Sequence, residues 1–352
     1  MTPRKEPRST PMPEAPRQAM RALVYDRAGE GDESGLGLVI RDLDVPEPGP
    51  GEASIRVSAY GLNQADILLM NNRHYTRSDL PMRLGYESSG IVAAVGSGVT
   101  RFKAGDRVST VPNIDGPYSC ANEYALAREE FTTPWPEGWS AAEAAGFWMQ
   151  YLTAYYPMKE IFPVAAGDWV LITAASGGTG LGAIRIAKTL GARVIATTRT
   201  SAKRDFLMEQ GADATVATAE EDVTAAIMSI TGGEGVRLIS DGVGGGFVAE
   251  YVNALAFNGI AYVHGGLSGT NDVSFPILSL VHRRAGLYGY SLINEVRDPE
   301  SLRRGIAFVT ERIADGRLGR PVIDRVYPLE EAVAAYERMK AGLQRGKIVV
   351  TL

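Results

Sequence analysis

The sequence feature that most constrains the fold is a glycine-rich turn between an apolar run and a helical pattern, within residues 170–188. Against the pattern Gly-x-Gly-x-x-Gly, the chain offers Ala175, Gly177 and Gly180. Small residues there allow a tight turn, a close approach of the backbone to a pyrophosphate, and packing of the helix on the strand. The helix N-terminus adds free N–H groups and the positive end of its dipole. Because a second apolar run follows at residues 192–198, the segment predicts a βαβ unit that binds a dinucleotide.

The end of the second predicted strand indicates which dinucleotide is bound. In NAD-binding units, an acidic residue about 20 positions after the glycines hydrogen-bonds the ribose 2′-hydroxyl. Here Thr198 takes that position, and Arg199, Thr200, Lys203 and Arg204 follow it. Cations and hydroxyl groups suit a 2′-phosphate, which a carboxylate would repel. The alternative is an ordinary solvated basic turn; the sequence favours NADPH as the cofactor.

Length and composition exclude several classes of protein. The 352 residues fit one large domain or two, and 45% apolar with 22% charged residues is typical of a soluble globular protein. A net charge of −5 argues against a nucleic-acid partner, and no apolar run reaches the length of a membrane span. The single cysteine excludes an internal disulfide and a cysteine-cluster zinc site. Residues 1–19 lack the apolar core of a signal peptide, so we expect a disordered tail and a cytoplasmic protein.

The pattern of elements changes along the chain. Residues 20–109 read as short strands separated by glycine and proline turns, which predicts a small β-barrel. After it, strands alternate with helices, including a helix at 220–230 and a last strand at 286–292, and this predicts a doubly wound parallel sheet. A final strand at 347–352 should return to the first domain. The expected domains are 20–149 with 291–352, and 150–290 for the nucleotide.

Motifs at 61–66, 84–90, 103–108, 151–155 and 344–350, together with the fingerprint, carry a family resemblance. In order and spacing, residues 20–352 resemble the medium-chain dehydrogenase/reductase superfamily, in its zinc-independent quinone oxidoreductase and enoyl reductase branch. The resemblance implies an α/β fold with a GroES-like β-barrel domain, a Rossmann domain and an active site between them. It also implies a homodimer, with a tetramer left open, joined through Rossmann domains at or near the strand around 260–263.

Departures from the alcohol dehydrogenase branch point to metal-free chemistry. That branch has a cysteine zinc ligand where this chain has Asn63 and a histidine ligand where it has Tyr86, so only Glu87 remains. Catalytic zinc needs three protein ligands, so no metal ligand is predicted. Without a Lewis acid, a conjugated acceptor is easier to reduce than a simple carbonyl, because its charge delocalises onto a distant oxygen.

We therefore expect an enzyme, an NADPH-dependent oxidoreductase that transfers hydride to a quinone or an α,β-unsaturated carbonyl compound of small size. One alternative is an enoyl reductase that acts on acyl thioesters. The other, from a different class, is a non-catalytic NADPH-binding sensor protein.

The resemblance also places the candidate site residues. Tyr75 and Asn63 are the predicted catalytic residues, beside the nicotinamide; Tyr75 either donates a proton or positions the substrate, and its alternative is a surface tyrosine on a loop. Asp66 and Glu87 are expected to anchor backbone near the cleft. The predicted cofactor-binding residues are Asn63, Thr153, Ser176, Gly177, Gly178, Thr179, Gly180, Thr198, Arg199, Thr200, Lys203, Gly242, Val243, His264, Gly266, Leu267 and Lys347.

Overall fold

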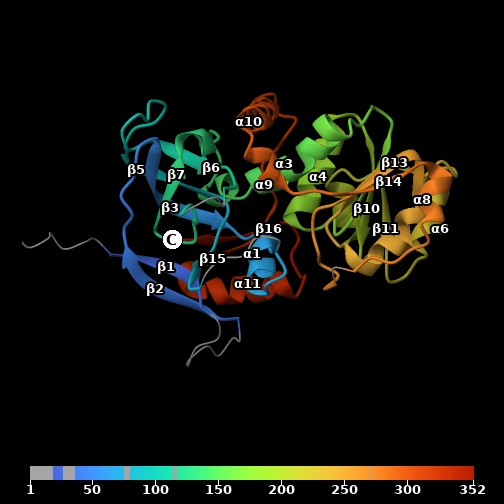
Figure 1. The fold of residues 1–352 in the computed structure, drawn as a ribbon, viewed down its shortest axis with the longest axis horizontal. Helices are drawn as coiled ribbons and strands as arrows, with labels where there is room; N and C mark the ends of the chain where they lie inside the picture. The colour runs from blue at the N-terminus through green and yellow to red at the C-terminus, as the bar shows by residue number, and fades with distance from the viewer. Residues whose placement is uncertain (1–18, 27–35, 75–79, 114–116, 271) are drawn as a thin grey trace, which may run out of the picture.

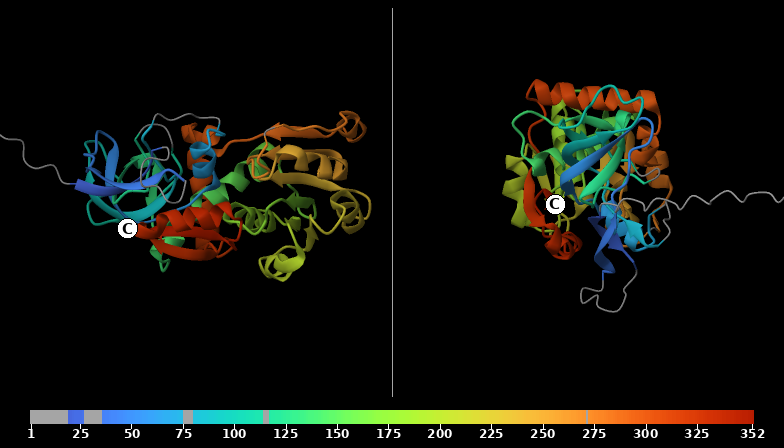
Figure 2. Two further views of the ribbon diagram at one scale, coloured as in Figure 1. Left: turned by 90° about the horizontal axis from the view of Figure 1, so that it is seen from below. Right: turned by 90° about the vertical axis from the view of Figure 1, so that its left-hand side faces the viewer.

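The protein has two lobes that lie side by side along its longest axis (Figures 1 and 2). The computed structural model describes residues 19–26, 36–74, 80–113, 117–270 and 272–352. One lobe is a β-barrel built from both ends of the chain, and the other is an α/β layer built from its middle. None of the helices in these ranges is long and apolar enough to cross a membrane.

The α/β lobe is a Rossmann fold around a six-stranded parallel sheet. In spatial order its strands are β11 (Ala214–Ala217), β10 (Arg193–Thr198), β9 (Trp169–Ile172), β12 (Val236–Asp241), β13 (Leu255–Val263) and β14 (Gly286–Gly289). The helices α4 (Gly178–Thr189), α5 (Arg204–Glu209), α6 (Val223–Ile230), α7 (Val248–Tyr251) and α8 (Leu278–Arg283) connect them. The strand order reverses between β9 and β12, which is where such sheets bind ligands. The predicted doubly wound parallel sheet is confirmed.

The barrel lobe is a GroES-like domain, as the sequence predicted. Its main sheet has the order β15 (Ile323–Pro328), β16 (Lys347–Thr351), β3 (Glu52–Gly61), β5 (Ser88–Val95), β6 (Arg107–Thr110) and β8 (Thr132–Pro134), and β7 (Tyr124–Arg128) pairs with β3. A smaller sheet holds β2 (Leu38–Asp44), β1 (Ala19–Tyr25) and β4 (Met82–Arg83). Strand β16 runs antiparallel to β3, with Val350 opposite Tyr60. The last strand therefore does return to the first lobe.

Helices fill the space around and between the lobes. They are α1 (Gln64–Met70), α2 (Ala141–Ala144), α3 (Trp148–Tyr155), α9 (Leu292–Val296), α10 (Pro299–Ala314) and α11 (Ala332–Lys340). A π-helix, η2 (Tyr156–Ile161), continues α3. Short 3₁₀ helices lie at η1 (Glu129–Phe131), η3 (Ser201–Lys203), η4 (Gly245–Phe247), η5 (Val252–Ala254) and η6 (Leu329–Glu331). Figure 1 shows α3, α9 and α10 between the two lobes.

Two predicted elements end or begin elsewhere. Helix α6 starts at Val223 rather than near residue 220, because the Asp222 side chain accepts a hydrogen bond from the backbone N–H of Ala225 and caps the helix there. Strand β14 ends at Gly289, and helix α9 begins at Leu292, where the sequence suggested continued strand. The domain boundaries at 149/150 and 290/291 stay a prediction.

A close approach between α3 and α4 fixes the fingerprint helix in the core. A Cβ atom added to Gly182 would lie 2.6 Å from the carbonyl oxygen of Gln150, on α3. Backbone atoms cannot move aside as a flexible side chain does. The third small position of the fingerprint is similar, because a Cβ on Gly180 would lie 2.5 Å from the Cα of Ala175. These glycines let the helix pack where the nucleotide turn needs it.

We predict that Gly182→Ala lowers the thermal unfolding midpoint, with a loss of roughly 1–3 kcal/mol from overpacking. The sign of this change in stability is informative, because alanine within a helix is otherwise more favourable than glycine by about 0.5–1 kcal/mol. Scanning calorimetry measures the change. Gly319→Ala is the matched control, since its added Cβ meets nothing within 4 Å. A midpoint for Gly182→Ala equal to or above that of the unaltered protein would contradict the close packing.

Candidate functional site

The fingerprint turn presents an open backbone to a ligand. It leads from β9 to α4, and Gly177 is the N-cap of α4 in extended conformation, with φ −81° and ψ 169°. A Cβ on Gly177 would meet only the carbonyl oxygen of Ala174, at 3.7 Å, so the space beside it is free of protein. Ser176, Gly178 and Thr179 lie next to it, and the first turn of α4 holds no acidic residue. This cradle fits a pyrophosphate, as expected for the amino end of a helix.

A buried carboxylate holds the turn that follows β12, the neighbour of β9 in the sheet. Asp241, at the end of β12, accepts hydrogen bonds from the Thr173 hydroxyl at 2.8 Å and the Tyr251 hydroxyl at 2.7 Å. It also accepts from the backbone N–H groups of Val243 at 2.8 Å and Gly244 at 3.1 Å. These bonds set the turn that contains Gly242 and Val243. Sequence reasoning missed Asp241, although an acid between a buried strand and a run of glycines is a visible signal.

The end of β13 packs against the turn that contains Gly242 and Val243. A Cβ on Gly265 would lie 2.5 Å from the carbonyl oxygen of Gly242, and the N–H of Leu267 donates to the same oxygen at 3.3 Å. His264 is half-buried, its Nε2 lies 3.3 Å from the Ser240 hydroxyl, and desolvation of the ring lowers its pKa to about 4. The ring is therefore neutral at pH 7. The structure brings Gly242, Val243, His264, Gly266 and Leu267 together at the carboxyl ends of neighbouring strands.

The basic turn after β10 joins the same edge of the sheet. Thr198 is the last residue of β10, and the exposed Arg199 and Thr200 follow it. Lys203 Nζ donates to the hydroxyl of Ser176 at 3.1 Å, so this cation lies against the fingerprint turn. The predicted 2′-phosphate residues and the predicted pyrophosphate residues are thus contiguous.

On the barrel side, the centre of the site is a buried ion pair. Lys347 Nζ donates to Glu87 Oε1 at 2.5 Å and to Asn63 Oδ1 at 2.6 Å. Asn63 Nδ2 donates to Glu87 Oε1 at 3.2 Å and to the carbonyl oxygen of Gly61 at 3.1 Å. Glu87 Oε2 accepts from the backbone N–H of Met149 at 3.0 Å. The amide of Asn63 is therefore engaged on both its oxygen and its nitrogen.

Three glycines make room for the Lys347 side chain. A Cβ on Gly61 would lie 2.6 Å from Lys347 Cε, one on Gly146 would lie 2.9 Å from Cγ, and one on Gly178 would lie 3.2 Å from Cδ. Gly178 belongs to the fingerprint turn, so Lys347 passes beside the proposed phosphate cradle on its way to Glu87. This contact joins the barrel and Rossmann halves of the site.

Thr153 and Tyr75 complete the predicted set. Thr153 lies on α3, nearly buried, and its hydroxyl donates to the carbonyl oxygen of Met149 at 2.6 Å. Tyr75 lies outside the described residues, so its catalytic role stays a prediction. Within the described ranges, no group of three or more His, Cys, Asp or Glu side chains could hold a metal ion.

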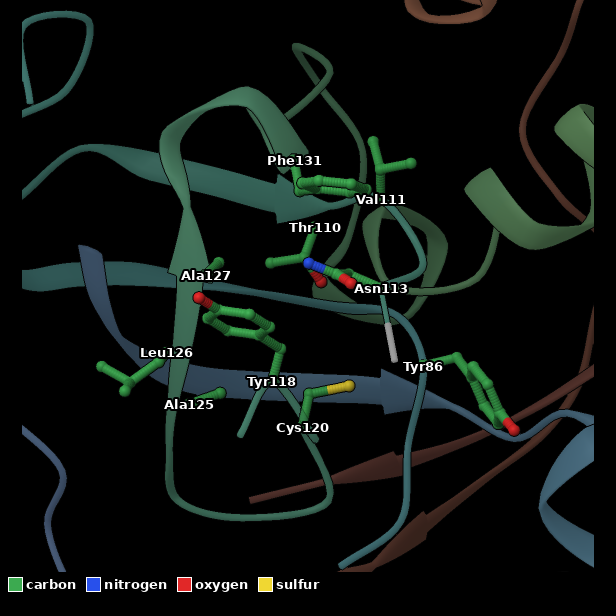
Figure 3. A pocket seen from close by; sticks show the side chains of 10 residues that line it. All are labelled: Tyr86, Thr110, Val111, Asn113, Tyr118, Cys120, Ala125, Leu126, Ala127 and Phe131. Carbon is green, nitrogen blue, oxygen red and sulfur yellow. The ribbon is translucent and has the colours of Figure 1, made fainter. Parts of the chain in front are cut away.

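A separate pocket lies inside the barrel (Figure 3). Its walls are Tyr86, Thr110, Val111, Asn113, Tyr118, Cys120, Ala125, Leu126, Ala127 and Phe131. None of the predicted catalytic or cofactor-binding residues is among them. Burial raises the pKa of the Cys120 thiol well above its ordinary value, which disfavours the reactive thiolate.

A second buried carboxylate, Asp66, holds the backbone of the barrel half. It accepts from the N–H of Asn63 and from the N–H of Gly85, each at 3.1 Å. Burial raises the pKa of Asp66 to about 6, and the two N–H groups and the Lys347 charge oppose that rise. Both Asn63 and the segment that leads to Glu87 are therefore positioned by a group that titrates near neutral pH.

We predict a pH-dependent difference in stability between the unaltered protein and Asp66→Asn. Because the pKa of Asp66 is raised in the folded state from 3.8 to about 6, its stabilising contribution is complete below pH 3.8 and is lost as pH rises through 6. The free energy of unfolding of the unaltered protein, relative to the variant, should fall by up to about 3 kcal/mol between pH 4 and 7.

Urea denaturation at a series of pH values measures this slope. The part of the difference in unfolding free energy that does not change with pH carries no information about the ionisation of Asp66. Asp205→Asn, which makes the same substitution at an exposed position on α5, is measured in parallel as the control. A flat difference for Asp66→Asn would show that the carboxyl ionises in its ordinary range.

Comparisons with known proteins agree with this architecture. Residues 49–177 match the family model described as the alcohol dehydrogenase GroES-like domain. Residues 178–311 match the model described as zinc-binding dehydrogenase.

Individual relatives fall into two groups. A quinone oxidoreductase of Pseudomonas aeruginosa is 31% identical over 315 residues, which cover 89% of this chain and 95% of that protein. A mycocerosic acid synthase-like polyketide synthase of Mycolicibacterium smegmatis is 32% identical over 344 residues, 94% of this chain but only 16% of the synthase. Among solved structures, a mycobacterial protein complexed with NADPH has a TM-score of 0.84 and 28% identity, and the match covers 95% of this chain and 100% of that one.

Proposed function

Because the chain belongs to the medium-chain dehydrogenase/reductase superfamily, in its quinone oxidoreductase branch, we propose that it is a metal-free, NADPH-dependent reductase of a quinone or an α,β-unsaturated carbonyl compound. The observation that carries the proposal is the continuous edge formed by the fingerprint turn, the basic turn at Lys203 and the turn held by Asp241. Such an edge suits a phosphorylated dinucleotide.

The residues of this edge divide the binding of NADPH among them. Gly177, Gly178 and the N–H groups of the first turn of α4 hold the pyrophosphate, and Lys203 with Arg199 holds the 2′-phosphate. Gly242, Val243, Gly266 and Leu267 line the path toward the nicotinamide, with the neutral His264 packed behind Gly242. When bound, NADPH supplies the hydride. The protein positions the acceptor and keeps water away from it.

The Lys347 network supports chemistry without a metal. The oxygen atoms of Asn63 and Glu87 that a cation could approach already bind the ammonium group of Lys347. A divalent ion at this place would displace Lys347 or share the site with it. Two unit charges 4 Å apart repel by about 4 kcal/mol at an effective dielectric constant of 20, and a divalent ion doubles that figure. A conjugated acceptor needs no such ion, because hydrogen-bond donors suffice for its delocalised charge.

An acyl-thioester enoyl reductase is the second candidate, and the likeness to a polyketide synthase favours it. Both candidates transfer hydride to a conjugated acceptor, and an acyl thioester differs from a small enone only in the group attached to the carbonyl carbon. A non-catalytic NADPH sensor is the alternative to both reductases. An activity measurement distinguishes it from them.

The test is NADPH consumption at 340 nm with 1,4-benzoquinone, 9,10-phenanthrenequinone, 2-hexenal or crotonyl-CoA, in EDTA, with NADH in parallel. We expect NADPH-dependent turnover that EDTA does not change. Turnover with crotonyl-CoA alone would favour the thioester candidate. Tight NADPH binding without turnover of any acceptor would favour the sensor.

Gly177→Val is the variant that links turnover to the cradle. Gly177 has extended backbone and free space at its Cβ, so the valine should fold normally but occupy the position of the pyrophosphate. We expect loss of turnover and of NADPH binding at an unchanged thermal midpoint. Full activity in this variant would place the cofactor elsewhere.

We also propose that the protein is a homodimer joined along β14. This strand is at the end of the parallel sheet, and α8 lies beside it (Figure 1). Large apolar side chains in and next to α8 are exposed. Ile277, Leu278 and Val281 are 65%, 69% and 64% exposed, and Leu287 and Tyr288 of β14 are partly exposed. A second copy related by a twofold axis would extend the sheet and cover this face, which removes an unpaired edge.

Leu278→Glu combined with Val281→Glu should convert the dimer to a monomer in sedimentation velocity. Val326→Glu is the control, because Val326 is 45% exposed on β15, in the other lobe. If the control dissociates the dimer and the double variant does not, the interface lies on the barrel lobe instead.

A further inference from the structure

A buried side chain beside the fingerprint turn carries an amide group that lacks a protein partner. Gln150, in the first turn of α3, is only 2% exposed. None of the described residues accepts a hydrogen bond from its Nε2 atom. A buried N–H group of this kind lowers stability, because it has lost its hydrogen bonds to water and gained none in return. Most buried polar groups in native proteins are hydrogen-bonded, so this one calls for an explanation.

The side chain of Gln150 extends along α4 toward the nucleotide turn. A Cβ added to Gly182, in the second turn of α4, would lie 2.6 Å from the carbonyl oxygen of Gln150 and 2.9 Å from its Cβ. A Cβ added to Gly178, the first residue of α4, would lie 3.6 Å from Oε1 of Gln150. The amide group is therefore displaced from the contact between the helices toward the amino end of α4, where the pyrophosphate cradle lies.

Two predicted cofactor-binding residues lie beside this amide. A Cβ on Gly178 would be 3.2 Å from Cδ of Lys347, so Lys347 and Gln150 border the same glycine. Thr153 is three positions beyond Gln150 on α3, and residues three apart share one face of a helix. The amide of Gln150 thus borders the cradle on the side of Lys347 and Thr153.

The chemistry of the amide indicates which ligand group it can satisfy. A glutamine amide offers two N–H donors on nitrogen and an acceptor oxygen. A pyrophosphate has only acceptor oxygens, so it could bind Nε2 but would bring negative charge to Oε1. A hydroxyl group both donates and accepts, and a vicinal pair of hydroxyls can therefore match both ends of an amide. The ribose that follows the pyrophosphate in a dinucleotide carries such a pair.

We propose that Gln150 binds the ribose hydroxyls of the nicotinamide half of the dinucleotide, as a cofactor-positioning residue whose amide gains its partners only when the cofactor binds. The inference rests on the proposed function, which assigns the dinucleotide to the crevice. It adds a residue of α3 to that function. A ribose held by Gln150 fixes the orientation of the nicotinamide ring attached to it, and therefore of the carbon that gives up the hydride.

Gln150→Met tests what the amide does in the protein without cofactor. Methionine has a similar length and volume but no N–H group, so the variant buries no unpartnered donor. Its thermal midpoint without cofactor should equal or exceed that of the unaltered protein. Scanning calorimetry measures this difference. A lower midpoint would overturn the inference, because Gln150 would then be a residue that stabilises the fold itself.

Titration calorimetry on the full chain tests the ligand group. The ligands are 2′-phospho-ADP, 2′-phospho-ADP-ribose and NADPH, and the second differs from the first only by the added ribose. Gln150→Met should weaken 2′-phospho-ADP-ribose and NADPH about tenfold and leave 2′-phospho-ADP unchanged, because only the contacts to the ribose are lost. Gln210→Met makes the same substitution at the end of α5 and should change none of the three.

Two binding results would overturn the inference. Equal weakening of all three ligands would place the amide at the pyrophosphate, and unchanged binding of all three would show that it does not contact the cofactor. ADP, ADP-ribose and NADH are titrated in parallel. A chain that prefers NADH but shows the same loss on addition of the ribose would contradict the proposed use of NADPH and support the role of Gln150. If the unaltered protein binds neither dinucleotide, the proposed function has failed, and this inference with it.

Discussion

A buried ion pair between Lys347 and Glu87 joins the last strand of the chain to its first lobe. Moving two charges out of water costs several kcal/mol for each, so such a pair is stable only when its remaining groups are hydrogen-bonded. Asn63 and the backbone N–H of Met149 supply those bonds. Because Met149 lies in the first turn of α3, the helix that leads to the Rossmann lobe, the pair fixes three segments that are distant in sequence. Loss of either charge would leave the other buried and unpaired.

The two halves of the site follow the same construction. Asp241 in the Rossmann lobe and Asp66 in the barrel lobe are fully buried carboxylates, and each accepts hydrogen bonds from backbone N–H groups. A carboxylate can satisfy several donors at once, which suits it to hold an irregular turn that has no ladder of its own. In both lobes the carboxylate orders the turn that presents the site residues. Burial raises the pKa of Asp66 to about 6, although two backbone N–H groups stabilise its charged form.

The sequence could predict those features that depend on residues close together along the chain. The fingerprint requires small residues within one turn and one helix, so Gly177 and Gly180 predicted the strand–turn–helix unit and the parallel sheet around it. The pattern of short strands and turns predicted the barrel and the return of β16, and the motif resemblance identified the barrel as GroES-like. The pair of Lys347 and Glu87 could not be predicted, because the residues lie 260 positions apart and a lysine at the start of a strand is ordinarily exposed. The start of α6 was missed for a smaller reason: two glutamates precede Asp222, and only the folded chain shows which acid caps the helix.

The contacts between the lobes differ in how firmly they hold. At the start of α3, Glu87 and the N–H of Met149 are buried, and a broken bond there would leave a charge without water or partner. At residues 341–346, the bonds from Lys203 to backbone oxygens are partly open to solvent, so water can replace them at little cost. We therefore expect adjustment between the lobes to be concentrated at this loop.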